Sequence, residues 1–215
     1  MPSRPRHVII QPVETSETIV ALLHTSGLLL QLDPLLPNVV TLLAGSPVRG
    51  SWWTHSAAHR IYGCLSEISQ HPDVLVTRLV RGKITFVHRR LWPDVFAVAR
   101  SQMPWQVAGL SASAHKLYEE VERQGILLSS GPTAKEIARR LLVHDEQVHT
   151  SAGHHELRLE SWSLWAERVT CPRTRTASEG LRQLEAVLLG LGGTIAMLPW
   201  GKQSRPVRLY YTKEN

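Results

Sequence analysis

The sequence predicts an α+β fold that is mainly helical, with tandem winged helix-turn-helix modules, each carrying a β-hairpin wing, and a short C-terminal helix–strand cap. Three observations lead to this prediction: three short helical patterns precede a hairpin pattern, a diverged copy of that order follows, and a leucine-rich helical pattern comes last. We expect the first module to span residues 1–100, the second 110–170 and the cap 171–215. The Pro- and Gln-containing segment 101–109 is the predicted boundary.

The first module begins with three helical patterns, at residues 14–27, 39–44 and 56–69. Gly27 supplies a stop signal for the first helix and Asn38 a cap for the second. The third pattern carries one apolar stripe, formed by Ala58, Ile61, Leu65 and Ile68. This third helix takes the recognition position of a helix-turn-helix.

A β-hairpin follows, with strands at 74–80 and 83–88 joined by the turn pair Arg81–Gly82. Alternation points Lys83 and Val87 to one face and Phe86 to the other. We expect one face of this hairpin to be buried and the other to be basic.

The second module and the cap repeat these signals. Helices are predicted at 113–124 and 133–142, the latter with a Thr133–Glu136 capping box. The remaining expectations are a hairpin over 146–162 turning at 152–153, a helix over 178–191, and strands over 194–200 and 208–213.

Composition places the chain among ordinary globular proteins, with 215 residues, 43% hydrophobic and 20% charged. Its apolar runs are far shorter than the ~20 residues that span a bilayer, and the N-terminus lacks a secretory apolar core. Cys64 and Cys171 show no disulfide or zinc spacing. We therefore expect a cytoplasmic protein with no membrane partner and no disulfide-linked partner.

The net charge of +6 is unevenly distributed. Residues 49–100 carry eight Lys and Arg against three Asp and Glu, and residues 172–215 carry seven against three. Such a basic excess is the expected footprint of a polyanion. Double-stranded DNA is therefore the predicted partner.

The stretch RGSWWTHSAAHRIY, residues 49–62, combines aromatic, histidine and arginine side chains just before and within the third helix. Arginines would contact phosphates, histidines phosphates or bases, and a tryptophan would stack on a base or wedge the duplex. The alternative is that one tryptophan packs into the core while the other covers the junction of helix and hairpin. Together with the hairpin cations, the predicted nucleic-acid-binding residues are Arg49, Trp52, Trp53, His55, His59, Arg60, Arg78, Arg81, Lys83, Arg89 and Arg90.

The histidines do not predict a metal site. His55 and His59 lack a nearby third ligand. A second cluster, formed by His144, His149, His154 and His155, is interspersed with glutamates. It fits a polar wing that pairs histidines with acids, although a divalent metal or a general base is the alternative. In an enzyme, His149 with Glu146 or His155 would be the acid–base candidates.

Residues 50–100 resemble the winged-helix modules of the AlkZ/YcaQ family of bacterial DNA glycosylases. The similarity rests on GSWWTHSAAHRIYGCLSEI and LVRGKITFVHRRLWPDVFAVA, with matching positions at Ser51, Trp52, Trp53, Leu65, Gly82, Arg89, Trp92 and Phe96. The family's catalytic signature is Gln, an apolar residue, then Gln or Asp, to which Gln31-Leu32-Asp33 conforms. In the family that signature lies much further upstream, in a separate helical module. The resemblance implies duplex DNA binding and DNA repair.

The sequence therefore predicts a DNA-binding protein acting in repair or genome maintenance. One alternative is a glycosylase-type hydrolase in which Gln31 and Asp33 place a water; another is a protein-interaction scaffold. Phosphate-loop, dinucleotide, zinc-protease and hydrolase motifs are all missing, so no cofactor is expected.

Overall fold

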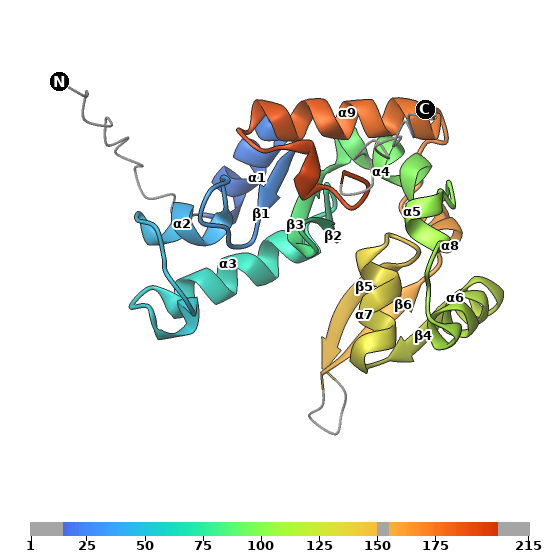
Figure 1. The fold of residues 1–215 in the computed structure, drawn as a ribbon. Helices are drawn as coiled ribbons and strands as arrows, with labels where there is room; N and C mark the ends of the chain where they lie inside the picture. Colours follow the sequence, from blue (N-terminus) through green and yellow to red (C-terminus); the bar gives the residue numbers. More distant parts are fainter. Residues whose placement is uncertain (1–14, 150–154, 202–215) are drawn as a thin grey trace, which may run out of the picture.

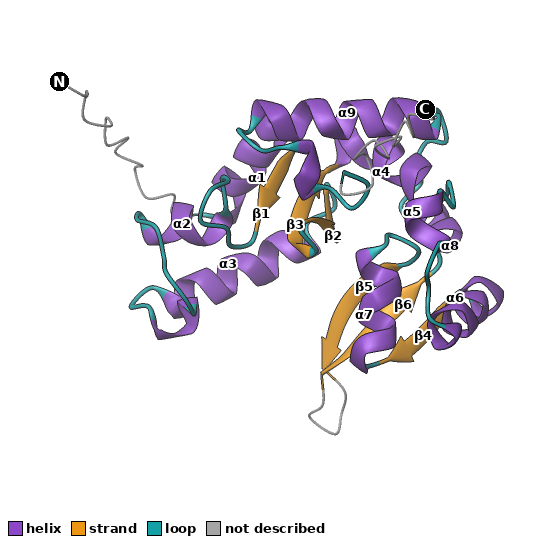
Figure 2. Ribbon diagram, in the orientation of Figure 1, coloured by secondary structure: helices purple, strands orange, loops and turns teal. Residues whose placement is uncertain are grey.

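The computed structural model describes residues 15–149 and 155–201, which form an α+β fold with two three-stranded antiparallel sheets (Figures 1 and 2). The first module contains α1 (Ser16–Ser26), β1 (Leu28–Leu30), α2 (Val39–Ala44), the 3₁₀ turn η1 (Trp52–Thr54), α3 (Ala58–Gln70), β2 (Val74–Val80) and β3 (Lys83–His88). The connection contains η2 (Arg89–Leu91), α4 (Trp92–Ala99) and α5 (Pro104–Val107). The second module contains α6 (Ala112–Gln124), β4 (Ile126–Ser129), α7 (Gly131–Arg139), β5 (His144–His149), β6 (His155–Glu160) and α8 (Trp162–Arg168). The C-terminal segment contains α9 (Ala177–Gly190) and η3 (Ile195–Met197).

Local signals set the first three helices as predicted. The Thr15 hydroxyl accepts from the Thr18 N–H at the start of α1, and Gly27 ends that helix with φ +81°. The Asn38 side chain accepts from the Thr41 N–H and starts α2. The predicted helices at 14–27, 39–44 and 56–69 are therefore confirmed as α1, α2 and α3.

Strand β1 is a feature that the sequence patterns did not predict. Its three residues pair with β3, so that the first sheet has the order β1-β3-β2. A three-residue apolar strand has no readable alternation, and its partner lies far along the chain. Its pairing therefore depends on tertiary structure.

The predicted hairpin is confirmed, and its turn residues Arg81 and Gly82 both have positive φ, at 54° and 67°. The expectation of one open basic face is wrong. Phe86 packs in a cluster with α1, α2 and α3, whereas Val87 on the opposite face packs in a cluster with α4, α8 and α9. Helices cover both faces, so this hairpin is an interior element of the fold (Figure 2).

The second module repeats the sheet order, as β4-β6-β5, but has one helix, α7, where the first has α2 and α3. The Thr133–Glu136 capping box is wrong, because α7 begins earlier, behind Ser130, and Glu136 instead accepts from the hydroxyl of Ser111 at 2.9 Å. The predicted hairpin turn at 152–153 lies outside the described residues.

The predicted cap helix is confirmed as α9, which packs along α4 (Figure 1). A Cβ on Gly180 would lie 2.5 Å from the Asp94 carbonyl oxygen, so only glycine permits this approach. The strand predicted at 194–200 is wrong, because Ile195–Met197 forms a 3₁₀ turn; the strand predicted at 208–213 lies outside the described residues.

One apolar cluster crosses all three of the predicted domain ranges. It joins Val87 of the first module, Trp162 of the second and Leu188 of the C-terminal segment. Trp105 and the fully buried Gln106 also lie inside, although they belong to the predicted boundary segment. The modules therefore share a core.

Candidate nucleic-acid interface

The two adjacent tryptophans lie in the 3₁₀ turn that precedes α3, and they have opposite exposures. Trp52 is 6% exposed and anchored among the core residues of α1, α2 and α3, whereas Trp53 is 60% exposed. Their rings stack at 4.0 Å with an interplanar angle of 24°. The buried ring therefore supports the exposed one and limits its movement.

Tyr62 extends this aromatic surface onto α3. Its side chain is 52% exposed, and its ring lies 5.7 Å from that of Trp53. Tyr62 is not among the residues that the sequence predicted for the site. A signal was present in the sequence, because Tyr62 follows Ile61 of the apolar stripe and therefore points away from the buried side of the helix. The pair presents two aromatic rings to solvent at the start of a helix.

Arg49 and His59 lie close to this aromatic pair in the sequence, and both are exposed. Arg49 has no ion pair or hydrogen bond with any residue that the structure describes. We call Arg49, Trp53, His59 and Tyr62 the α3 surface.

The other predicted contacts in this stretch have structural roles. Nδ1 of His55 accepts from the Ala57 N–H at 3.1 Å and so stabilises the turn into α3. The Arg60 guanidinium donates to the carbonyl oxygen of Leu43 at 2.5 Å, which satisfies a free carbonyl at the end of α2. Trp52 belongs to the core.

The cations of the hairpin tip bind an acid of their own chain. The Lys83 ammonium lies 2.7 Å from Oδ2 of Asp33, and the Arg81 guanidinium lies 3.4 Å from the same oxygen. The tip is also held by the Arg81 N–H, which donates to the Met197 carbonyl oxygen at 2.7 Å. These contacts attach the tip of the predicted wing to the protein.

The remaining hairpin arginines are similarly engaged. Arg78 on β2 donates to Asp145 on β5 at 2.8 Å and thereby joins the two modules. Arg89 pairs with Asp73 at 3.5 Å, and Arg90 donates to the carbonyl oxygens of the last turn of α1. The basic excess of this segment therefore contributes mostly to internal contacts.

The candidate catalytic residues follow β1. Oδ1 of Asp33 accepts from the N–H groups of Leu35 and Leu36, and Oδ2 accepts from Lys83, so both oxygens are occupied. Burial alone would raise the pKa of Asp33, but hydrogen bonds from Lys83 and the two N–H groups outweigh it and lower the pKa.

Gln31 is half-buried and uses its backbone, which pairs with Ile84 and Val40. The arrangement stabilises the loop and gives no support to a water-activating role for Gln31 and Asp33.

No protein-family model, curated protein or solved structure matches this chain. Function is therefore inferred from geometry alone.

The second histidine cluster is only partly within the described residues. His144 is buried, with Nδ1 3.4 Å from Oε2 of Glu160, while His149 of β5 and His155 of β6 are partners in the backbone register. His154 lies outside the described residues.

Glu160 is fully buried, and Arg168 donates to both of its carboxylate oxygens, at 3.0 and 2.7 Å. Burial alone would raise the pKa of Glu160, but hydrogen bonds from His144 and Arg168 lower it to about 2. Pairing of this histidine with an acid thus accounts for its burial.

Residues 15–149 and 155–201 contain no group of three or more His, Cys, Asp or Glu side chains that is placed to hold a metal. Cys64 and Cys171 are both free thiols, and burial raises the pKa of each to about 11. In this part of the chain, no helix combines the length and the apolar character that crossing a bilayer requires.

Proposed function

We propose that this protein binds duplex DNA through the α3 surface, with the first module acting as a winged helix-turn-helix. The observation that carries the proposal is the exposed Trp53–Tyr62 pair, whose rings lie 5.7 Å apart. Stacking of a base on an aromatic ring contributes about 1–3 kcal/mol, and it requires no particular base. A supported aromatic pair is suited to stack on an unstacked base or to wedge a base step.

The order of elements supports the same function. The first module runs α1-β1-α2-α3-β2-β3, so α3 is the helix that precedes the hairpin. In helix-turn-helix proteins the recognition helix places its N-terminal residues against base edges in the major groove. His59 and Tyr62 lie in the first turns of α3, at the corresponding end.

The charge distribution limits which cations take part. Arg49 has no partner in the part of the chain that the structure describes and can contact a phosphate, whereas the hairpin arginines have partners within the chain. Breaking the pairs of Arg78 and Arg81 with the buried carboxylates of Asp145 and Asp33 would offset the gain from new phosphate contacts. We therefore assign binding to the α3 surface and leave the hairpin out of the contact.

A second candidate function is protein recognition through the same surface. Tryptophan and tyrosine are the side chains that most often dominate protein–protein binding energies. The exposed Trp53–Tyr62 pair would be such an anchor. This function predicts binding that depends little on salt, because the α3 surface, as defined by its four described residues, contains a single arginine, Arg49.

Fluorescence anisotropy separates the two functions. A labelled duplex of about two helical turns, ~20 base pairs, is titrated with protein between about 50 and 200 mM salt. DNA binding predicts affinity that falls with salt, and Arg49→Gln should reduce the log–log slope by ~0.9. Affinity that is independent of salt, or no binding, would exclude the DNA proposal.

A further inference from the structure

Two basic side chains on α7 differ from those of the hairpin, because neither has a partner among residues 15–149 and 155–201. Lys135 and Arg139 are exposed and lie one helical turn apart. Neither forms an ion pair or hydrogen bond with any residue in the described part of the chain. Their neighbour Arg140, by contrast, pairs with Glu136 at 3.8 Å and donates to the carbonyl oxygen of Ala108 at 2.7 Å.

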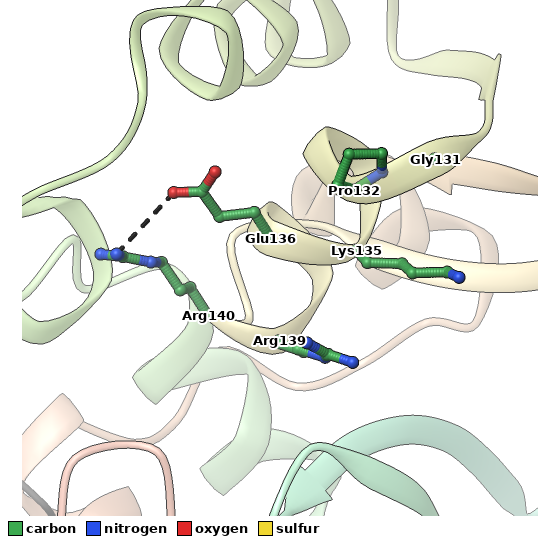
Figure 3. A pocket seen from close by; sticks show the side chains of 6 residues that line it. All are labelled: Gly131, Pro132, Lys135, Glu136, Arg139 and Arg140. Atoms are coloured by element: carbon green, nitrogen blue, oxygen red, sulfur yellow. Dashed lines mark ion pairs between the residues drawn. The ribbon is translucent and has the colours of Figure 1, made fainter.

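These two cations line a surface hollow of about 440 Å³. Figure 3 shows Lys135 and Arg139 extending to one side of α7, while Glu136 and Arg140 point to the other side. Glu136 is held there by Arg140 and by the Ser111 hydroxyl, which donates at 2.9 Å. Glu136, the acid among the described residues that line the hollow, is therefore turned away from the two cations.

The hairpin of the first module supports this site. A Cβ on Gly82 would lie 3.4 Å from Cγ of Arg139, so the arginine stem passes directly against the hairpin turn. Gly82 has φ +67° and leaves room for that stem. The Arg139 side chain thus lies at the junction of the two modules, against the hairpin turn, where Asp33 is already paired with Arg81 and Lys83.

We propose that Lys135 and Arg139, which we call the α7 surface, bind backbone phosphates of the same duplex that the α3 surface contacts. This inference rests on the proposed function. Side chains four residues apart on a helix are separated by about 6 Å along its axis. The phosphates of one DNA strand recur every ~3.4 Å along the duplex axis, so two cations at this spacing can contact two phosphates.

The position of α7 in the second module supports this assignment. It immediately precedes the β5–β6 hairpin, as α3 precedes the β2–β3 hairpin. Residues 101–171 carry seven basic and nine acidic side chains, so composition gives no sign of a phosphate site there. The site arises because Glu136, the acid of α7, is held by Arg140 and Ser111 and points away from the two cations. The second module would then contribute positioning contacts to phosphates without reading bases.

The test compares Lys135→Gln/Arg139→Gln with the wild-type protein in a salt-dependent anisotropy titration of labelled duplex DNA. Loss of two phosphate contacts should reduce the log–log slope by ~1.8 and weaken binding roughly 60-fold at 0.1 M salt. Lys116→Gln/Arg123→Gln on α6 is the control for charge, because it removes the same charge from exposed positions outside the hollow, where Arg123 is paired with Glu120 at 3.7 Å. Far-UV circular dichroism should show both variants folded, since all four side chains are exposed.

A slope that falls in the α7 variant and stays at the wild-type value in the α6 variant supports the proposal. Equal slopes in the two variants would overturn it while leaving DNA binding by the α3 surface intact. A wild-type protein that fails to bind the duplex would overturn the proposed function as well.

Discussion

The two sheets of this protein have the same strand order. They differ in the residues on one face, the face that points away from the helices of the sheet's own module. Val87 on β3 pairs with Leu75, and both are buried in the shared core. At the matching place in the second sheet, Glu160 on β6 pairs with His144. Helices therefore enclose the first sheet on both faces, while the second has one apolar face and one charged face.

The difference explains why local charge does not identify a binding surface here. The basic segment 49–100 builds a sheet that is interior, and its arginines satisfy acids and free carbonyls of the chain. The acidic segment 101–171 leaves two cations of α7 without acidic partners among the described residues. Which surface can bind a polyanion therefore depends on which charged side chains already have a partner within the chain.

The largest expected effect is that of a charge placed on the interior face of the first sheet. Val87→Glu would bury a carboxylate at a fully buried position that lies among apolar side chains, which should cost at least about 4 kcal/mol of unfolding free energy. Leu128→Glu on the far face of the second sheet, at 58% exposure and opposite Arg158, should change stability by no more than about 0.5 kcal/mol. Urea unfolding followed by circular dichroism measures both, and equal stability of the two variants would refute the contrast between the sheets.

The next largest effect concerns the buried acid of the second sheet. Glu160→Gln leaves Arg168 and Arg158 without their carboxylate and should cost about 3 kcal/mol at neutral pH. Because the folded-state pKa of about 2 lies below the ordinary 4.5, ionised Glu160 stabilises the protein above pH 4.5, and this contribution is lost as the pH falls toward 2. Unfolding free energies measured across this range should therefore converge for wild type and variant at low pH. A difference that stays constant with pH would contradict the role of the charge.

A smaller effect is expected where the two sheets meet. Arg78→Gln removes the partner of Asp145, whose side chain is only 5% exposed, and should cost about 2 kcal/mol. Asp73→Asn removes an exposed pair with Arg89 and should cost less than about 1 kcal/mol. Urea unfolding of both variants gives the comparison; an equal cost would mean that the Arg78–Asp145 pair does not hold the modules together.

Much of the fold could be predicted because its signals are local. The Asn38 cap, the Gly27 stop and the Arg81–Gly82 turn each act within a few residues, and the structure has each where the sequence placed it. Strand β1 could not be predicted in this way, since its pairing partner β3 lies far along the chain. The prediction of a Thr133–Glu136 capping box is wrong for the same reason, because Glu136 accepts a hydrogen bond from Ser111, the N-cap of α6.

The position of the candidate site could be predicted from the sequence, but the residues that form it could not. The paired tryptophans do precede α3, yet which of them faces outward depends on how η1 packs against the core. Residue type and strand alternation predict the hairpin cations as DNA contacts. Neither signal shows that Asp33 and Asp145 lie beside these cations in the fold. Such pairing across distant segments requires the structure.

The most direct test of where DNA binds is to compare Trp53→Ala with Arg78→Gln in the duplex anisotropy titration, since Trp53 is an exposed ring of the α3 surface and Arg78 is a hairpin cation that is paired with Asp145. Loss of the exposed ring should weaken binding by about 1–3 kcal/mol, roughly 5- to 150-fold, with little change in stability. Arg78→Gln should leave the dissociation constant within about twofold, because this arginine already has a partner in Asp145. Binding that survives Trp53→Ala and is lost in Arg78→Gln would contradict the assignment of DNA contact to the α3 surface.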